Sequence, residues 1–303
     1  MVRLSTRVDH LIAVGRTTLT GWAFVFPASL LLGVFGIGSV GYVGYLSLLK
    51  WNLINPVPQF VGFLNYAQLF ADSNFWAAVW RTLFYLVGTT AIIMPLSLAL
   101  ALLLRDRLHA NRIFRSLFFL PYVVPTVASA IAWSWLFEAH HGLVNMFLRM
   151  FHLPPQPWLS SPSEALLVIM LLYIWQFTGY FVILYLNGLQ SVPQHLYESA
   201  AIDGAGGWQK FWHITLPMIT PTTFFILTMS IIFSFLSFDQ VYVLTEGGPA
   251  QSTTTIIYYL FQEGFQFFDI GRAGATAMVL FAFLLLVTFL QFKGESRWVH
   301  HQM

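Results

Sequence analysis

Long uncharged stretches, separated by short charged ones, constrain the fold of this chain more than any other feature. Each is long enough for a helix of about 20 residues to cross the hydrocarbon core of a bilayer. These stretches lie between Arg16 and Lys50, Arg81 and Arg105, Arg115 and Glu138, Glu164 and Glu198, Lys210 and Asp239, and Arg272 and Lys293. Only 9% of the 303 residues are charged, whereas soluble domains carry about 25%. The chain is therefore a polytopic membrane protein, and no length is left for a separate soluble domain.

The uncharged stretches predict an all-α fold, because backbone that crosses a bilayer must satisfy its own hydrogen bonds. Two further uncharged stretches are excluded as spans, residues 51–71 because they contain two prolines and three asparagines, and residues 150–163 because they contain four prolines. Six transmembrane helices are predicted, near residues 21–48, 82–104, 116–137, 166–189, 218–243 and 273–292.

The placement of Lys and Arg predicts the orientation, since cytoplasmic loops carry an excess of both. One side of the six predicted spans holds Arg3, Arg7, Arg16, Arg105, Arg107, Arg112, Arg115, Lys210, Lys293 and Arg297. The other side holds Lys50, Arg81, Arg149 and Arg272. Both termini are therefore expected in the cytoplasm, as is the segment 193–217. The first apolar run is too long for the core of a signal peptide, so we expect it to stay as an anchor.

Several missing motifs narrow the chemistry expected of this chain. It has no cysteine, which excludes disulfides and thiolate metal sites. It has no Gly-Lys dipeptide and hence no P-loop, and no GxSxG or HExxH motif. His140 and His141 are adjacent and lack the i, i+4 spacing of helical metal ligands. We expect no catalytic residue, no metal and no bound cofactor on this chain, and the net charge of +2 does not suggest nucleic acid as a partner.

The predicted cytoplasmic segment, YESAAIDGAGGWQKFWHITLP (197–217), is unusually structured for a connection between two spans. Gln194 to Asp203 predicts a short helix, which three glycines then interrupt. Trp208 to Ile214 predicts a second one, and Pro217 stands where the fifth span is expected to begin. The residues alone leave two interpretations open. The segment lies on the lipid headgroups, or it docks onto a partner.

The same segment resembles the EAA loop of permease subunits from bacterial ATP-binding-cassette (ABC) importers, which carry Glu-Ala-Ala, then Asp-Gly-Ala, then Ile-x-Leu-Pro. The matching positions are Glu198-Ser199-Ala200, Asp203-Gly204-Ala205 and Ile214-Thr215-Leu216-Pro217. Only Ser199 departs from the pattern. Residues 60–70, 115–137 and 241–265 also resemble the carbohydrate branch of that family, the maltose and glycerol-3-phosphate permeases.

The resemblance implies one permease domain over residues 1–303, with the type I importer fold, in a bacterial cytoplasmic membrane. It implies a second homologous permease subunit, an ATPase homodimer that holds ATP and Mg, an extracytoplasmic solute-binding protein and membrane lipid as partners. The loop would then act as a coupling helix on the ATPase. Its coupling residues would be Glu198, Ala200, Asp203, Gly204, Ile214, Leu216 and Pro217.

The fifth predicted span carries a second candidate site. Ser230, Phe233, Ser234 and Ser237 recur on one helical face. Their spacing alone is equally typical of helix packing, since small residues let membrane helices approach closely. The resemblance to maltose-type permeases implies that these four, together with Tyr180, line the path of the substrate. Hydroxyl groups and an aromatic face suit a sugar or polyol.

Asp239 follows this span. A carboxylate at membrane depth suggests a functional site, but its position near the outer end favours simple exposure to water. The last outer loop and the C-terminal stretch resemble the glycerol-3-phosphate subset, so that substrate class is expected, with neutral mono- or oligosaccharides as the alternative. An ion-coupled secondary transporter is the alternative from another class. It would need internal repeats and coupling-ion ligands, which are not evident.

Overall fold

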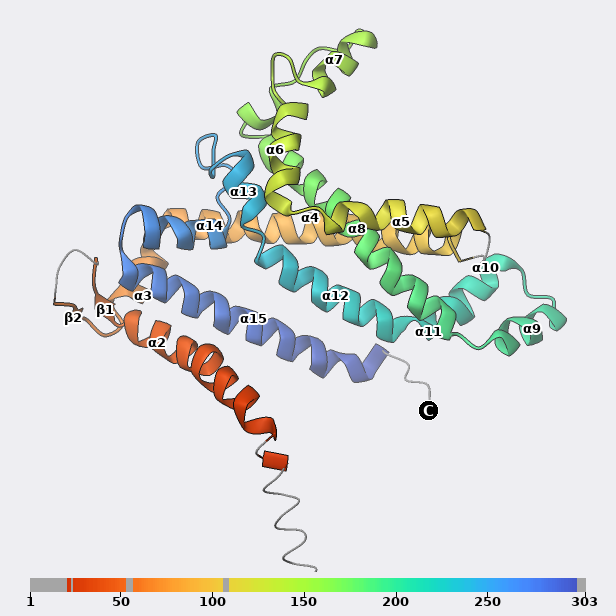
Figure 1. Cartoon of the computed structure of the whole chain (residues 1–303), viewed down its shortest axis with the longest axis horizontal. Helices are drawn as coiled ribbons and strands as arrows, with labels where there is room; N and C mark the ends of the chain where they lie inside the picture. Colours follow the sequence, from red (N-terminus) through yellow and green to blue (C-terminus); the bar gives the residue numbers. More distant parts are fainter. Residues whose placement is uncertain (1–20, 23, 53–56, 106–108, 299–303) are drawn as a thin grey trace, which may run out of the picture.

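The computed structural model describes residues 21–298 except 23, 53–56 and 106–108, and describes only the backbone at 109–112 and 296–298. Within the described residues the chain is almost entirely helical, as predicted (Figure 1). The only strands described there are Leu49–Lys50 (β1) and Gln59–Phe60 (β2), which pair antiparallel. The predicted all-α class is confirmed.

Four helices of the described chain are long and apolar enough to cross a membrane, and two bent pairs raise the number to six if each pair is one span. The four are Phe24–Leu46, α4 (Ser73–Leu103), α8 (Ala165–Ser191) and α15 (Ile270–Trp298). The first of these contains a π-helical segment, η1 (Leu32–Gly38), followed by α2 (Ser39–Leu46). The predicted first, fourth and sixth spans therefore lie close to observed helices.

The second span begins earlier than predicted. Helix α4 starts at Ser73, nine residues before position 82, because Asp72 caps it by accepting a hydrogen bond from the Asn74 amide at 2.8 Å. Its 31 residues extend over about 46 Å, which is longer than the hydrocarbon core. Arg81 therefore lies inside the helix and not before it. The short helix α3 (Leu64–Ala71) precedes this cap.

The prediction of one continuous helix over 116–137 is wrong. Helix α5 (His109–Val123) and α6 (Thr126–Leu136) meet at 94°, and α6 leaves the bundle (Figure 1). Pro125 explains the break, because its ring disfavours helical geometry in the preceding Val124. Beyond α6 lie α7 (Leu143–Met150) and the 3₁₀ turn η2 (Trp158–Ser160).

The fifth span is also shorter than the predicted 218–243. Helix α12 covers Thr220–Phe235, and a separate helix, α13 (Asp239–Leu244), follows a break at residues 236–238. At its other end α12 meets the preceding helical segment, Gly207–Met218, at 64°. The span thus begins at Thr220, with Pro221 in its first turn where a missing N–H is tolerated.

Helix α8 forms the centre of the bundle. Of its apolar window, 67% is buried, against 0% for Phe24–Leu46 at the periphery. It packs against α4, α5 and α12. Gly179 allows the contact with α5, since a Cβ there would stand 1.7 Å from the Phe118 carbonyl oxygen. The main core joins α4, α6, α8, α12 and α13.

The bundle has two different ends, which Figure 1 shows at right and left. The loop end carries α9 (Gln194–Ile202), α10 (Gly207–Lys210), the π-helical turn η3 (Phe211–Thr215) and α11 (Leu216–Met218). The hairpin end carries β1, β2, α3, α14 (Ile256–Phe261) and the π-helical turn η4 (Gln262–Gln266). The predicted position of both termini depends on residues such as Arg3, Arg7 and Arg16, which lie outside the described residues.

Candidate functional site

The segment 193–217 folds as the two short helices that its glycines predict. Helix α9 ends where Gly204 adopts a φ of 78°, in the left-handed region that glycine enters at little steric cost. The Ala205 amide then donates to the Ala200 carbonyl at 2.8 Å, and the Asp203 amide to the Ser199 carbonyl at 3.0 Å. These bonds satisfy the last carbonyls of α9 and fix the direction of the turn.

The two halves of the segment are fastened to each other and to the bundle. The Tyr197 hydroxyl is 2.9 Å from Thr215 Oγ1, which joins α9 to η3. The Arg105 guanidinium, just beyond the end of α4, lies over the Tyr197 ring at 4.6 Å from its centroid. Ile214 is half-buried and packs against the main core. The segment is therefore rigidly connected to the spans.

The outward face of the segment 193–217 combines charged groups with exposed apolar surface. Glu198 and Asp203 are exposed, while Ile202 and Trp208 are 88% and 73% exposed. An apolar surface beside carboxylates at the end of a bundle is typical of a protein–protein interaction site. Leu216 and Pro217 are half-buried in α11, just before the fifth span. All seven predicted coupling residues thus lie in or next to this one compact segment.

The serine face of α12 turns toward α4. Ser230 Oγ is 2.9 Å from Thr90 Oγ1, and Ser234 Oγ is 3.2 Å from Thr89 Oγ1. Both serines are at most 2% exposed. The structure therefore places Ser230 and Ser234 in a hydrogen-bonded helix interface, as the packing interpretation requires. Their role in lining the substrate path stays a prediction.

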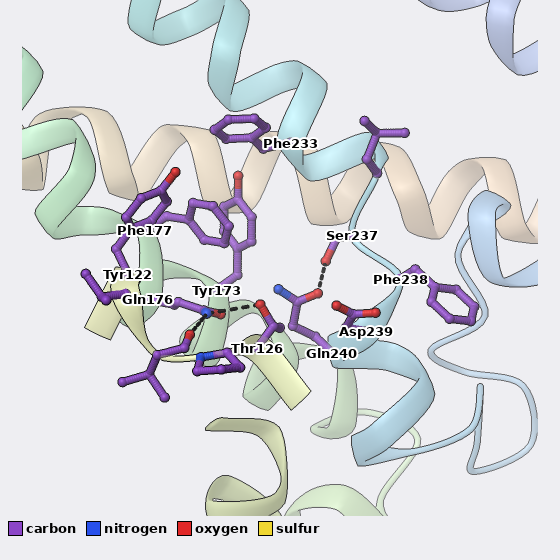
Figure 2. A pocket seen from close by; sticks show the side chains of 14 residues that line it. Tyr122, Thr126, Tyr173, Gln176, Phe177, Phe233, Ser237, Phe238, Asp239 and Gln240 are labelled. Carbon is purple, nitrogen blue, oxygen red and sulfur yellow. Dashed lines mark hydrogen bonds between the residues drawn. The ribbon is translucent and has the colours of Figure 1, made fainter. Parts of the chain in front are cut away.

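A pocket of about 490 Å³ lies beside that interface, between the α5–α6 bend, α8 and the α12–α13 break (Figure 2). Of the predicted lining residues, Phe233 and Ser237 face it. Ser237 Oγ donates to Gln240 Oε1 at 2.7 Å and is 2.9 Å from the Tyr85 hydroxyl. Tyr180 lies outside the lining and stacks on Tyr122, which does line it, at 4.7 Å between ring centroids.

The pocket wall presents hydroxyl, amide and carboxylate groups. Gln176 Nε2 donates to the Val124 carbonyl at 3.2 Å and to Thr126 Oγ1 at 3.0 Å, which fixes the orientation of the amide. Gln176 is 2% exposed, and its Oε1 has no hydrogen-bond partner among the described residues. Asp239 adds a carboxylate, and none of the residues that line the pocket is Lys, Arg or His. The rest of the wall is largely aromatic.

Sequence reasoning missed Gln176. The available signal was that an amide stands in the middle of a largely apolar span, and polar residues in spans are usually functional. For Asp239, simple exposure to water was favoured over a functional site, and the side chain is indeed exposed. The structure places this exposed carboxylate in the pocket wall, at the start of α13.

A second polar cluster, also missed, lies at the hairpin end. Asp72 accepts hydrogen bonds from Arg272 Nη2 and from the Tyr259 hydroxyl, the latter at 2.9 Å. Arg272 Nε stands 3.4 Å from Glu263 Oε2. Burial raises the pKa of Glu263 above its ordinary value, although the Arg272 charge opposes the shift. The cluster joins the start of α4 to η4 and to α15.

Comparison with known proteins agrees with this architecture. The family model described as the inner membrane component of binding-protein-dependent transport systems matches residues 91–293. Two solved structures share the fold, both of a bacterial ABC transporter for alginate. One, in complex with its pentasaccharide-bound periplasmic protein, is 22% identical with a TM-score of 0.84, covering 96% of this chain and 98% of its own. The other is 23% identical with a TM-score of 0.80, covering 94% and 99%.

Relatives of similar length are closer in sequence. A probable ABC transporter permease of Pyrococcus horikoshii is 33% identical, covering 90% of this chain and 96% of the relative. The probable permease YesP of Bacillus subtilis is 32% identical, covering 96% and 94%. The sn-glycerol-3-phosphate permease UgpA of Pectobacterium atrosepticum is 31% identical, covering 95% and 98%.

The bundle with its two bent spans, and the segment 193–217 whose short helices are attached to it, have the architecture of a type I ABC importer permease. Such a permease is a translocation subunit and not an enzyme. The chain belongs to the family of inner membrane components of binding-protein-dependent transport systems.

Proposed function

We propose that this chain couples ATP hydrolysis on a separate ATPase homodimer to solute passage, through the segment 193–217. The observation that carries the proposal is the loop itself. It exposes Glu198 and Ile202, and the Tyr197–Thr215 bond and the Arg105 contact tie it to the spans. A carboxylate at an interface forms charge-assisted hydrogen bonds, and a rigid helix transmits a rigid-body motion. ATP and Mg belong to the partner ATPase.

The assembly that follows has four kinds of component. A second homologous permease subunit completes the pathway, two ATPases dock at the loop end, and a solute-binding protein docks at the hairpin end. The loop end and both termini then face the cytoplasm of a bacterial cell. Nucleotide binding favours one of two global states, so closure of the ATPases moves the loop and opens the spans outward. The periplasmic protein bound to the related alginate transporter supports this arrangement.

Glu198→Ala and Gly204→Pro test the coupling role in the reconstituted importer. Both variants are expected to reduce transport-coupled ATP hydrolysis and uptake together. Gln194→Ala, an exposed change at the start of the same helix, is the matched control and leaves both rates unchanged. If neither loop variant lowers coupled hydrolysis, the coupling role is wrong.

The substrate class is proposed from the pocket and from the relatives. Both support a polyhydroxylated solute of the sugar class. The relatives named for sn-glycerol-3-phosphate transport favour that compound or its diesters. The pocket favours the alternative, an uncharged mono- or oligosaccharide. It offers a free amide oxygen, a carboxylate and aromatic faces but no cation. No residue of the pocket wall carries a positive charge that would offset the repulsion between a phosphate and the Asp239 carboxylate.

Competition for uptake decides between the two substrate classes. Uncharged sugars and sn-glycerol-3-phosphate are offered to the reconstituted importer together with its binding protein. If the solute is an uncharged sugar, as the pocket favours, Asp239→Asn leaves sugar uptake nearly unchanged and Gln176→Leu reduces it. Uptake of sn-glycerol-3-phosphate by the unaltered importer, with no gain on Asp239→Asn, would instead assign the phosphate class.

A further inference from the structure

A second cavity, of about 340 Å³, lies between the spans near the hairpin end, away from the pocket of Figure 2. Its wall comes from α3, α4, α12, α14 and α15. Seven of its eleven lining residues are Phe, Trp or Leu: Phe70, Phe75, Trp76, Leu83, Phe235, Leu280 and Phe283.

The polar side-chain groups of the cavity wall are already hydrogen-bonded within the protein. The only hydroxyl of the wall belongs to Thr82, whose Oγ1 donates to the Ala78 carbonyl at 2.8 Å and accepts from the Ile256 amide at 2.8 Å. The Trp76 indole N–H, at the rim, donates to the Phe70 carbonyl at 2.9 Å. A buried water needs two to four polar partners, and apolar cavities without them stay dry. The cavity therefore suits an apolar occupant.

Two apolar stripes continue from the rim along the outside of the bundle. On α4, Trp76 (53% exposed) leads to Trp80 (71%) and Phe84. On α15, Phe283 leads at helical spacing to Leu286 (54%) and Leu290. In a chain that spans the membrane, such stripes face acyl chains. The rim of the cavity thus belongs to a surface that lipid covers.

The depth of the cavity agrees with that occupant. Val279 and Phe283 lie nine and thirteen residues after the start of α15 at Ile270, which is about 14 to 20 Å along the helix. On α15, Arg272 of the ion cluster lies about two turns nearer the hairpin end than Val279, and on the α4 side Asp72 lies about one turn before Phe75 and Trp76 of the cavity wall. Because two carboxylates neutralise Arg272, this cluster offers no free cation to a headgroup.

We propose that the cavity is a lipid site that takes an acyl chain of a phospholipid from the leaflet at the hairpin end, independently of the headgroup. The apolar wall, the lipid-facing rim and the neutralised ion cluster all indicate that the site recognises the acyl chain of the lipid and not its headgroup. About 340 Å³ is roughly twice the volume of an apolar cavity that holds benzene. A bound acyl chain lies between α4, α12 and α15, and the serine–threonine bonds fix the relative position of the first two of these helices.

Photolabelling tests the site on the full-length chain. The chain is reconstituted into vesicles of phosphatidylethanolamine and phosphatidylglycerol. These contain a trace of either lipid with a diazirine near the middle of one acyl chain. Labelling is expected at residues of the cavity wall, Phe75, Val79 and Leu83 on α4 and Val279 and Leu280 on α15, equally with both headgroups. Labels confined to the exposed stripes, such as Trp80 and Leu286, would overturn the proposal, as would a requirement for one headgroup.

Matched variants separate the cavity from general lipid contact. Val279→Trp fills the cavity, whereas Leu286→Trp makes a similar enlargement on the exposed part of the same helix. Only the first is expected to lower cavity labelling, by roughly tenfold, the loss that follows when about two methylene groups lose their burial. Leu83→Phe, on α4, gives a milder second filling if Val279→Trp does not fold. Equal labelling of all three variants and the unaltered chain contradicts the site.

The same labelling is finally measured in the assembled importer. Cavity labelling that persists in the complex with the second permease subunit and the ATPases supports the lipid site. Labelling of the isolated chain that disappears on assembly would overturn it, since the partner subunit would then fill the cavity.

Discussion

Among single residues, Gly204 is the position where the turn of the segment 193–217, the proposed coupling loop, depends most on residue type. Its φ of 78° is unfavourable for any residue with a Cβ, although a Cβ there would meet no atom within 4 Å. Gly204→Ala is therefore expected to strain the turn by roughly 1–2 kcal/mol without a clash. Coupled ATP hydrolysis and uptake measure the effect, and both should fall.

Gly207→Ala is the control for that experiment. Gly207 begins α10, does not have a positive φ, and also has open space where a Cβ would lie. Its substitution should leave coupling unchanged. Equal losses for the two variants would show that small size at the loop surface, and not the left-handed turn, is what the loop needs.

The ion cluster at the hairpin end predicts opposite effects for its two carboxylates. Asp72→Asn leaves Arg272 with one partner whose ionisation burial disfavours. Because Asp72 and Arg272 are partly exposed, the destabilisation should be smaller than the loss of about 3–5 kcal/mol that is typical of a fully buried pair. Glu263→Gln removes that disfavoured charge and keeps the shape. It should be nearly neutral or stabilising. The thermal denaturation midpoint of the purified chain distinguishes the two.

The pH dependence follows from the raised pKa of Glu263. Below its ordinary value of 4.5 the carboxyl is neutral in both the folded and the unfolded chain. As pH rises through the higher folded pKa, the native state must ionise a buried group, so stability is lost. The denaturation midpoint should fall as the pH rises above about 4.5, and Glu263→Gln should reduce that fall. An unchanged slope in the variant would rule out Glu263 as its source.

At the scale of elements, the contact between α4 and α12 separates two explanations of the serine face. Ser230 and Ser234 bond to Thr90 and Thr89 across it. Each bond between membrane helices contributes about 0.6 kcal/mol on average. Ser230→Ala and Ser234→Ala should lower stability by roughly that amount each and leave the KM for solute unchanged. A raised KM with unchanged stability would instead support a lining role.

Prolines show why element boundaries were harder to predict than the existence of the spans. Pro95 lies inside α4 and Pro121 inside α5, yet neither ends its helix. Pro125 stands at a break of 94°. Neighbouring helices and side chains can satisfy the backbone groups that a proline frees, so the outcome depends on packing that one sequence does not reveal. Uncharged length, in contrast, depends only on composition.

The two candidate sites were predictable to different degrees for a related reason. The coupling loop is local in sequence, and its glycines and spacing determine most of its geometry. The pocket joins Gln176 on α8 with Thr126 and Asp239, which lie 50 residues or more away along the chain. Only the α5–α6 bend and the α12–α13 break bring them together. A pattern within one helix could therefore indicate Phe233 and Ser237 but not their partners.

At the scale of the whole molecule, the apolar surface of some elements is buried by neighbouring elements, whereas that of others is not. Helix α8 is enclosed by its neighbours, while Phe24–Leu46 has none of its apolar window buried. Large apolar side chains are also exposed at the loop end, among them Ile202 and Trp208. Bilayer lipid covers the flank of a span but does not cover a loop that projects beyond it. The two surfaces therefore need different partners, and the loop end fits the proposed ATPase.

Trp208 is the strongest candidate for an anchor in that contact. It is 73% exposed and packs edge-on against Trp212, with ring centroids 5.6 Å apart, so the free chain already holds its ring in place. Exposed aromatic residues of this kind dominate interfaces, and their truncation typically costs about 2 kcal/mol or more, which is about 30-fold in affinity. Trp208→Ala should therefore reduce co-purification of the ATPase by about that factor.

Phe60→Ala provides the matched control, because Phe60 is 71% exposed at the opposite end of the bundle. It should not affect retention of the ATPase, and both variants should keep the denaturation midpoint of the unaltered chain. If Trp208→Ala retains the ATPase fully, the apolar face of the loop is not the contact. The exposed carboxylates Glu198 and Asp203 would then have to provide it, and high salt would release the ATPase because screening weakens exposed charge pairs.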